Sequence, residues 1–372
     1  MQMVDLVSQT EKIYAELQVA IEHVLLKGDF INGEEVRLFA EELGQYMEGM
    51  SVVPCANGTD ALQISLMALG LRSGDEVVVP AFTYAASAEV IALLGLRPVM
   101  VDVDERTFNL DPTVLENAWS PRVKAVIPVH LYGRSADMHG VLQWANTHAV
   151  KVVEDNAQSL GALYEMGGST VKVGTLGDVS CTSFFPTKNL GCFGDGGAMM
   201  TRNCELAERL RMIANHGQRE KYCHEVIGCN SRLDTLQAAI LRIKLKHLDE
   251  YLNARIAAAE YYSAQLSGIA EIIMPEIRGC TFHQYTLRVL DGQRDALRRH
   301  LHALGVPSMV YYPLALCDQP AFRNCGRVVG ALDVSRRLVG EVISLPMHTE
   351  LTRELQDKVI EGIHSFFLSK KR

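Results

Sequence analysis

A single lysine stands in an unusual local sequence, CTSFFPTKNLGCFGDGG, which spans residues 181–197. An apolar run ending in Phe184 and Phe185 precedes Lys188, and four glycines follow it. Burial among apolar groups disfavours an ammonium ion and lowers the pKa of a lysine, which makes its amine a nucleophile towards carbonyl compounds. Glycines let the backbone approach a ligand closely. The stretch therefore predicts a reactive amine, although taken alone it also suits a structural lysine.

The segment Asn57-Gly58-Thr59-Asp60 precedes a helical pattern and suggests a phosphate site. Free backbone N–H groups and a hydroxyl at the positive end of a helix dipole attract phosphate. Ser183, five positions before Lys188, is a candidate for a second phosphate donor. An ordinary helix cap is the alternative interpretation of this segment taken alone.

Two acids, Glu154 and Asp155, end the strand-like run KVVEDNA, and Gln158 follows shortly after. Open α/β sheets bind ligands at the carboxyl ends of their strands. An aspartate there can keep a heterocyclic nitrogen protonated, whereas a turn aspartate that caps the next segment explains the same pattern equally well.

These features occur in a fixed order along the chain, together with the aromatic residue Tyr84. A phosphate site, a stacking ring, a strand-end acid and a framed lysine are what pyridoxal phosphate requires. The combination therefore predicts a pyridoxal phosphate site, and it suggests no metal ligands.

Alternating strand and helix patterns surround these residues. Short continuous apolar strands separated by helices indicate a mostly parallel, buried sheet. The expected strands are 76–82, 97–104, 124–131 and 151–157, and the expected helices between them are 59–69, 86–95 and 141–149. The expected later elements are a long helical stretch over 232–266, strands 283–290 and 308–313, and helices 294–305 and 353–367. We predict an α/β fold with a large cofactor-binding domain over residues 1–245 and a smaller α/β domain over 246–372.

The composition excludes several classes of protein. A net charge of −8 disfavours binding to nucleic acid, which needs a basic face. The nine cysteines include no C-x-x-C pair, so a disulfide framework or a zinc site is not expected, and a reducing cytoplasm is favoured. The N-terminus lacks the pattern of a signal peptide, and no apolar run reaches the ~20 residues that span a bilayer.

Several stretches together resemble the DegT/StrS family of sugar-nucleotide aminotransferases over nearly the whole chain. They are FINGEEV (30–36), ANGTDAL (56–62), PAFTYAASAEVI (80–91), VHLYG (129–133), EDNAQSLGA (154–162), TSFFPTKNLGCFGDGGA (182–198) and NSRLDTLQAAIL (230–241). The resemblance implies the aspartate-aminotransferase fold, which is fold type I of the pyridoxal phosphate enzymes. Within the family, the likeness is greatest to enzymes that aminate UDP-2-acetamido-2-deoxy-3-oxo-D-glucuronate.

The resemblance also implies roles for individual residues in binding the cofactor. Lys188 is expected to bind the cofactor covalently, Asp155 to pair with its pyridine nitrogen, and Gln158 to contact its phenolic oxygen. Tyr84 is expected to stack on the ring. The expected phosphate ligands are Gly58, Thr59 and Ser183.

For the substrate, the resemblance implies a homodimer with composite active sites. Asn230 would reach the cofactor phosphate of the neighbouring subunit, and Arg232 would lie near the sugar, where a guanidinium suits a uronate carboxylate. Tyr311 and Tyr312 lie where the sugar should bind. This segment departs from the family pattern, because the uronate enzymes are expected to carry histidine there and Ala315 interrupts the usual Pro-Leu-Pro-Leu sequence.

The function implied is transfer of an amino group from L-glutamate to the 3-oxo sugar of a nucleotide sugar, for bacterial surface polysaccharide such as O-antigen. The alternatives are a dTDP-3-oxo-6-deoxyhexose or 4-oxo sugar aminotransferase, a pyridoxal-dependent sugar dehydratase, and a non-catalytic regulator that keeps the cofactor pocket. The presence of Lys188 disfavours the dehydratase, because the dehydratases in question replace this lysine with histidine or add an iron–sulfur cluster.

Overall fold

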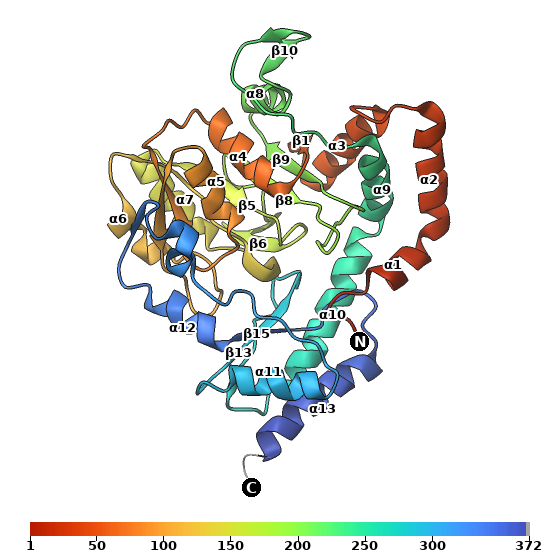
Figure 1. Ribbon diagram of the computed structural model, residues 1–372, viewed down its shortest axis with the longest axis vertical. Helices are drawn as coiled ribbons and strands as arrows, with labels where there is room; N and C mark the ends of the chain where they lie inside the picture. The colour runs from red at the N-terminus through yellow and green to blue at the C-terminus, as the bar shows by residue number, and fades with distance from the viewer. Residues whose placement is uncertain (370–372) are drawn as a thin grey trace.

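The computed structural model describes residues 1–369, which are built around one eight-stranded sheet (Figure 1). The strand order is β1-β9-β8-β5-β4-β2-β3-β14. The bounds are β1 Ser51–Cys55, β2 Glu76–Pro80, β3 Arg97–Val101, β4 Val123–Val126, β5 Lys151–Asp155, β8 Val179–Ser183, β9 Gly197–Thr201 and β14 Arg327–Val328. The six strands from β8 to β14 pair in parallel, and β9 runs antiparallel to both of its neighbours, β8 and β1.

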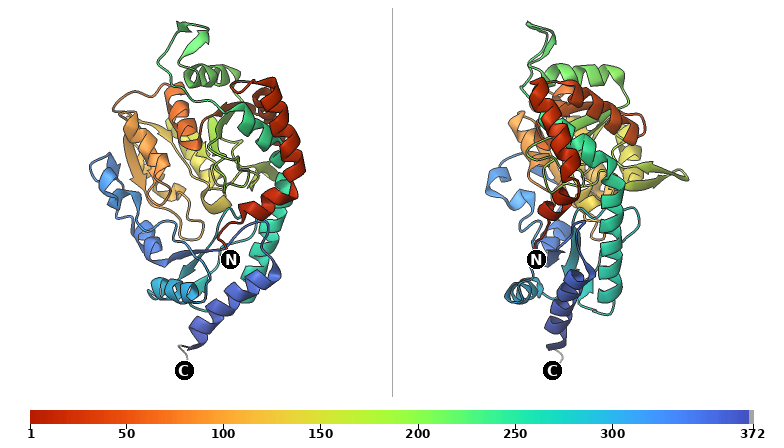
Figure 2. Two further views of the ribbon diagram at one scale, coloured as in Figure 1. Left: turned by 45° about the vertical axis from the view of Figure 1, so that its right-hand side comes forward. Right: turned by 90° about the vertical axis from the view of Figure 1, so that its right-hand side faces the viewer.

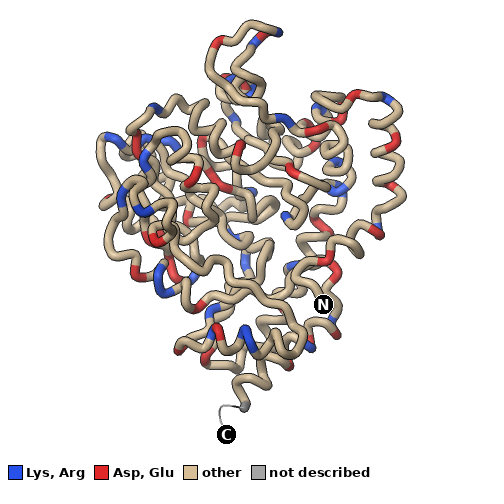
Figure 3. The backbone as a smooth tube through the Cα atoms, in the orientation of Figure 1, with Lys and Arg blue, Asp and Glu red and all other residues tan. Residues whose placement is uncertain are grey.

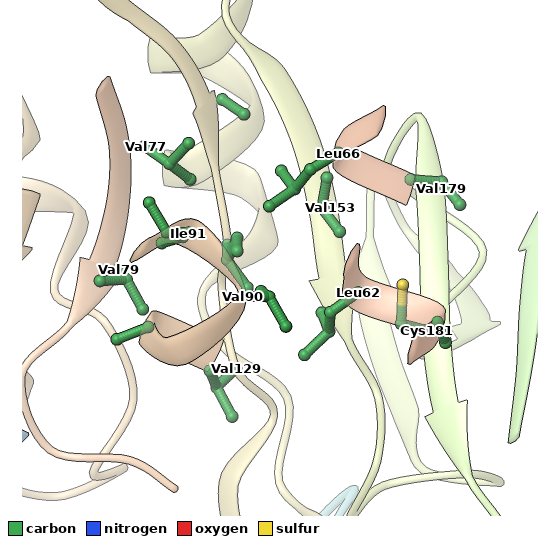
Figure 4. Close-up of a cluster of buried hydrophobic side chains, with 14 of the residues drawn as sticks. Leu62, Leu66, Val77, Val79, Val90, Ile91, Val129, Val153, Val179 and Cys181 are labelled. Carbon is green, nitrogen blue, oxygen red and sulfur yellow. The ribbon is translucent and has the colours of Figure 1, made fainter. Parts of the chain in front are cut away.

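Helices cover both faces of this sheet. Along β2, Val77 and Val79 pack with α4 (Gly58–Ala68) and α5 (Ala86–Leu93), whereas Val78 packs on the other face with α7 (Met138–His148). Successive side chains of a strand point to opposite faces, so an uninterrupted valine run supplies both cores. Figure 4 shows the first core, where Leu62 and Leu66 of α4 and Val90 and Ile91 of α5 meet the strand residues.

The remaining elements of the sheet-bearing part lie around this framework. They are α1 Leu6–Lys12, α2 Tyr14–Lys27, α3 Glu34–Tyr46, η1 Pro112–Val114, α6 Leu115–Ala118, η2 Leu131–Gly133, the hairpin of β6 Leu163–Met166 with β7 Ser169–Lys172, and α8 Cys204–Ala214. After α8, residues 215–230 form an arm that contains β10 Gln218–Glu220 and β11 Cys223–His224. The arm projects beyond the body of the molecule, at the top of both views in Figure 2.

A separate core lies in the C-terminal part of the chain. Tyr262 of α10, Tyr285 of β13, Leu297 and Leu301 of α11, and Ile363 of α13 meet in it. The elements after residue 234 are α9 Thr235–Lys246, α10 Leu248–Leu266, β12 Ile272–Ile273, β13 Tyr285–Val289, α11 Arg294–Ala303, η3 Leu316–Asp318, η4 Pro320–Phe322, α12 Asp333–Glu341, β15 Val342–Leu345 and α13 Arg353–Ser369. Of these, α9 packs against α3, and η3, η4 and α12 contribute to the core of the large sheet. Strands β12, β13 and β15 form a separate sheet, while β14 joins the large one. The domain boundary at residue 245 stays a prediction.

Most of the expected elements are confirmed to within a few residues, with two differences. The long helical stretch is two helices, α9 and α10, which meet at His247. The strand expected over residues 308–313 is wrong, because only Met309 bridges to Ser344 of β15. Prolines at 307 and 313 bound this segment, and a proline has no N–H to donate to a neighbouring strand.

Acidic and basic residues are interspersed over the chain (Figure 3), as expected of a protein whose net charge is small for its length. No helix within residues 1–369 combines the length and the apolar character that crossing a membrane requires.

Candidate active site

Lys188 lies just beyond the carboxyl end of β8, in a turn that its own backbone closes. Its N–H donates to the carbonyl of Phe185 across 2.8 Å. A side chain at Gly191 would place its Cβ 2.3 Å from the Pro186 carbonyl oxygen, so the glycine lets the following loop fold tightly over this turn. Burial lowers the pKa of Lys188 to about 8, against the opposing effect of the Asp155 carboxylate. Within the described residues, the ammonium has no hydrogen-bond partner.

The N-terminus of α4 touches the end of β8, so the expected phosphate ligands Gly58 and Ser183 are neighbours. A Cβ on Gly58 would lie 2.8 Å from the Cβ of Ser183. The Asn57 side chain caps the N–H of Asp60 at 2.8 Å, and the Asn57 carbonyl accepts from Ala61. The N–H groups of Gly58 and Thr59 are left without an intrahelical acceptor, as at any helix start. Two free donors therefore lie close to Ser183, whose hydroxyl oxygen accepts from the N–H of Phe185 at 3.2 Å.

Asp155 ends β5, the strand that pairs with β8, and it lies opposite Cys181. Its buried carboxylate accepts hydrogen bonds on both oxygens. Oδ1 accepts from the N–H of Ala157 at 3.2 Å and Oδ2 from the hydroxyl of Ser87 at 2.8 Å. The structure thus brings Asp155 and Lys188 to the same end of two adjacent strands.

Gln158 and the two tyrosines at 311 and 312 close one side of the site. The Gln158 amide donates to the Tyr312 hydroxyl, and its oxygen accepts from the N–H of Tyr132. The Tyr132 hydroxyl in turn donates to the carbonyl of Tyr311. The Tyr84 ring lies 6.0 Å from the Tyr312 ring, and the residue is 59% exposed.

Asn230 and Arg232 lie apart from these groups. Asn230 is exposed at the base of the arm, where it bridges to Asn215. Arg232 lines a cavity of about 650 Å³ that lies beside α3, β1 and α8 and is also lined by Arg37 and Arg211. Across residues 1–369, neither Asn230 nor Arg232 hydrogen-bonds to the residues around Lys188.

The sequence did not single out two buried residues of the site. Ser87 lies only three positions after Tyr84, and a serine in a helical stretch that is apolar except for Glu89 is the signal that could have revealed it. His283 has no such signal, because its position depends on the packing of β13. Burial and the charges of Lys188 and Arg255 lower the pKa of His283 well below 6.5, so its ring is neutral near pH 7.

A buried hydrogen-bond network around Glu154 supports the strand that carries Asp155. Glu154 accepts hydrogen bonds from His130 and from the N–H groups of Gly174, Leu176 and Gly177. The Nδ1 atom of His130 accepts from the N–H of Ala136, so its Nε2 carries the proton donated to Glu154. His130 thus joins the backbone at Ala136 to Glu154 of β5.

The site's groups can bind a phosphate, pair with a protonated ring nitrogen and offer an amine to a carbonyl. The comparison with known proteins agrees with this chemistry, because residues 11–364 match the model of the DegT/DnrJ/EryC1/StrS aminotransferase family. The chain belongs to this family. Its members depend on pyridoxal phosphate, and the chain is a sugar aminotransferase with the fold predicted from the sequence.

Individual relatives match the chain over almost its full length. It is 42% identical over 370 residues to a pleiotropic regulatory protein of Geobacillus stearothermophilus, with 98% of each chain covered. It is 44% identical over 352 residues to the UDP-2-acetamido-2-deoxy-3-oxo-D-glucuronate aminotransferase of Pseudomonas aeruginosa, which covers 94% of this chain and 96% of that one. It is 41% identical over 365 residues to the dTDP-3-amino-3,4,6-trideoxy-alpha-D-glucose transaminase of Streptomyces venezuelae, with 97% and 95% covered.

The crystal structure of a DegT DnrJ EryC1 StrS aminotransferase from Brucella abortus superposes with a TM-score of 0.94 at 40% identity. The match covers 98% of this chain and 99% of that one. The predicted family, fold class, enzyme class and cofactor are therefore confirmed. The names of the relatives differ in nucleotide and sugar, so they establish the amination of a sugar and leave its identity to be proposed.

Proposed function

We propose that this enzyme transfers the amino group of L-glutamate to UDP-2-acetamido-2-deoxy-3-oxo-D-glucuronate, as a cytoplasmic step in making bacterial surface polysaccharide such as O-antigen. The observation that carries the transamination is the partly buried Lys188 amine beside the Asp155 carboxylate at the ends of β8 and β5. The observation that favours a uronate is Arg232, whose guanidinium lines a cavity without a carboxylate partner among residues 1–369.

Each group around Lys188 has a role in this proposal. The free N–H groups of Gly58 and Thr59 and the Ser183 hydroxyl would hold the phosphate of pyridoxal phosphate. Asp155 would pair with the pyridine nitrogen, and Tyr84 would stack on the ring. Gln158 would meet the phenolic oxygen from the side where it already contacts Tyr312. The bound cofactor supplies an electron sink that makes the amino acid's α-hydrogen acidic.

Lys188 would bind the cofactor's aldehyde carbon and also move the proton. A pKa of about 8 leaves part of the amine neutral at neutral pH, and a group with a pKa close to the working pH both accepts and returns a proton efficiently. Because glutamate and the sugar would use the same site in turn, the enzyme should follow ping-pong kinetics.

A second subunit would complete the site. The arm exposes two large apolar side chains, with Tyr222 81% and Ile227 86% exposed, which is typical of a surface that another chain covers. Asn230 lies at the base of this arm and Arg232 lies two positions later. In a symmetric dimer these two residues would reach the partner's cofactor phosphate and sugar, while Tyr311 and Tyr312 would line the sugar site from within the same chain.

The test is a half-reaction with purified enzyme. Glutamate should convert the bound pyridoxal form to the pyridoxamine form with one equivalent of 2-oxoglutarate, and the uronate oxo sugar should restore the pyridoxal absorbance. Faster restoration by a dTDP-linked neutral 3-oxo or 4-oxo sugar would reassign the substrate. The regulatory relative motivates a second candidate, a non-catalytic regulator; a protein that binds cofactor but releases no 2-oxoglutarate would favour it.

Arg232→Ala and Arg232→Lys test the uronate assignment. We expect Arg232→Ala to reduce kcat/KM for the uronate sugar roughly a hundred-fold, because a charge-assisted bidentate contact is lost. The same sugar lacking the carboxylate should be affected little. An equal loss with both sugars would overturn the role given to Arg232.

A further inference from the structure

Ser87 makes a hydrogen bond that its position on a helix does not require. Its side chain is fully buried on α5, and its hydroxyl lies 2.8 Å from Oδ2 of Asp155. Ser65, in the interior of the neighbouring helix α4, donates to the carbonyl four residues back, and its hydroxyl lies 2.7 Å from the carbonyl oxygen of Ala61. Ser87 lies in the first turn of α5, where the residue four positions back precedes the helix. Its hydroxyl donates to the end of β5 instead.

The direction of this hydrogen bond follows from the chemistry of its partners. An ionised carboxylate only accepts, so the Ser87 proton points at Asp155. The other oxygen of Asp155 accepts from the N–H of Ala157 at 3.2 Å. With a donor on each oxygen, the plane of the carboxylate is fixed, and the remaining lone pairs are aimed in set directions. A donor to a carboxylate also favours its charged form over the neutral acid.

We propose that Ser87 is a positioning residue for the cofactor: it orients the Asp155 carboxylate towards the pyridine nitrogen. The inference rests on the role of Asp155 in the proposed function. It is independent of which sugar is aminated, because it concerns the strength of one contact to the ring. Ser87 itself does not touch the ring in this assignment.

The competing explanation is that Ser87 only ties α5 to β5. A structural tie would affect all ligands of the pocket equally. A positioning role would affect only ligands that offer a ring nitrogen to Asp155. Pyridoxal phosphate and its 1-deaza analogue, in which carbon replaces the ring nitrogen, make this distinction because they share the aldehyde, the phenolic oxygen and the phosphate.

The experiment compares dissociation constants of both compounds for the full-length protein freed of cofactor. Wild type should bind pyridoxal phosphate more tightly than the deaza analogue. Ser87→Ala should weaken pyridoxal phosphate binding roughly ten-fold and change deaza binding less than two-fold, as expected for a hydrogen bond acting on a charged contact. Ser87→Thr, which keeps the hydroxyl, should restore the preference. Ser65→Ala is the matched control, a buried serine that does not contact Asp155 and should leave the preference unchanged.

A second readout is the pH midpoint of the absorbance change of the bound cofactor. The midpoint should move in Ser87→Ala and return in Ser87→Thr. If Ser87 were only a structural tie, Ser87→Ala would lower the melting temperature and leave the midpoint unchanged. Equal weakening of both compounds, or an unchanged midpoint, would overturn the inference while leaving Asp155 in its proposed role. If wild type itself failed to prefer pyridoxal phosphate, the role of Asp155 would be overturned and this inference with it.

Discussion

The side-chain amide of Gln158 donates a hydrogen bond to the Tyr312 hydroxyl across 3.2 Å, and so joins the loop after β5 to a segment of the C-terminal part. The oxygen of the same amide accepts from the N–H of Tyr132 at 2.7 Å. The Tyr132 hydroxyl in turn donates to the carbonyl of Tyr311, which completes a network of three hydrogen bonds. Three segments far apart in sequence are thereby held together at the wall of the cofactor site.

This hydrogen-bond network predicts that Gln158 and Tyr312 are energetically coupled. In a double-mutant cycle with Gln158→Ala and Tyr312→Phe, we expect a coupling free energy of about 0.5–1.5 kcal/mol, the usual worth of one buried hydrogen bond. Urea unfolding of the two single variants and the double variant measures it. Strictly additive effects would show that the bond seen between these side chains contributes nothing to stability.

The reactivity of Lys188 should depend on pH in a way that an ordinary lysine's does not. Burial lowers the pKa of Lys188 to about 8, so the neutral amine becomes the major form above pH 8 rather than above 10.5. In protein freed of cofactor, the rate of Schiff-base formation with pyridoxal phosphate should therefore rise with a midpoint near pH 8. Stopped-flow absorbance between pH 6 and pH 10 measures this rate.

Lys244 provides a matched control for this measurement. Burial also lowers the pKa of Lys244 to about 8, but this lysine faces an apolar groove beside Phe193 rather than the phosphate donors. We expect Lys188→Ala to abolish Schiff-base formation and to lower turnover by a factor of at least ~10³, and Lys244→Met to change neither greatly. A midpoint near 10 in wild type would contradict the burial argument.

The sequence alone predicts the framework because its signals are local. Continuous valine runs predict strands covered on both faces, and the glycine-dense loop around Lys188 predicts close backbone approach. Asp155 is predicted because the end of a parallel strand is a known place for ligand-binding groups. Each of these inferences needs only a few consecutive residues.

The relationships between distant segments could not be predicted in the same way. Glu154 and Asp155 are adjacent in sequence, yet a strand turns successive side chains to opposite faces. Asp155 therefore enters the site while Glu154 binds the loop over residues 174–177, and only the structure shows which loop lies there. The bonds from Ser87 to Asp155 and from Gln158 to Tyr312 depend likewise on the final packing.

Glu154 should be one of the most sensitive positions for stability. Burial alone would raise its pKa, but the hydrogen bonds from His130 and from the backbone of Gly177 and Leu176 hold it below the usual 4.5. Glu154→Gln loses the charge that these donors require and should destabilise the protein by about 2–4 kcal/mol at pH 7. Glu165→Gln, an exposed glutamate on the β6–β7 hairpin, is the control and should have little effect.

The pH dependence gives this prediction a second measurement. Because the pKa of Glu154 is lower in the folded protein than in the unfolded chain, its ionised form stabilises the fold above the unfolded-state pKa. That contribution is lost as pH falls through the folded-state pKa. The difference in unfolding free energy between wild type and Glu154→Gln should therefore shrink below about pH 4.5. A difference that grows on acidification would contradict the assigned charge state.

The phosphate site can be tested by pairing a serine substitution with a cofactor lacking phosphate. Ser183→Ala removes a hydroxyl beside the N-terminus of α4 and should weaken pyridoxal phosphate binding roughly ten-fold. Binding of pyridoxal, which has no phosphate, should not change. Ser180→Ala is a control on the same strand, since the buried Ser180 hydroxyl has no hydrogen-bond partner in the described part of the chain. Equal losses with both ligands would remove Ser183 from the phosphate site.

The proposed composite dimer predicts a result that an active site built within one subunit cannot give. Lys188→Ala and Arg232→Ala should each be nearly inactive on the uronate sugar as homodimers. In a mixed dimer, both defects would fall into one site and leave the other with an intact Lys188 and an intact Arg232 from the partner. Refolding the two variants together in equal amounts should therefore restore roughly a quarter of wild-type activity, because half of the dimers are mixed and each has one working site.

Differently tagged subunits allow the mixed dimer to be isolated, and its activity should then approach half of the wild-type value. The control is a mixture of Lys188→Ala with Asp155→Asn, two changes within the same proposed half-site. It should recover no activity, because each site of that mixed dimer keeps one defect. No recovery in the Lys188→Ala and Arg232→Ala pair would place Arg232 in the same subunit's site as Lys188 and remove the reason for a composite active site. Recovery in the control would contradict the placement of Lys188 and Asp155 in one subunit's half-site.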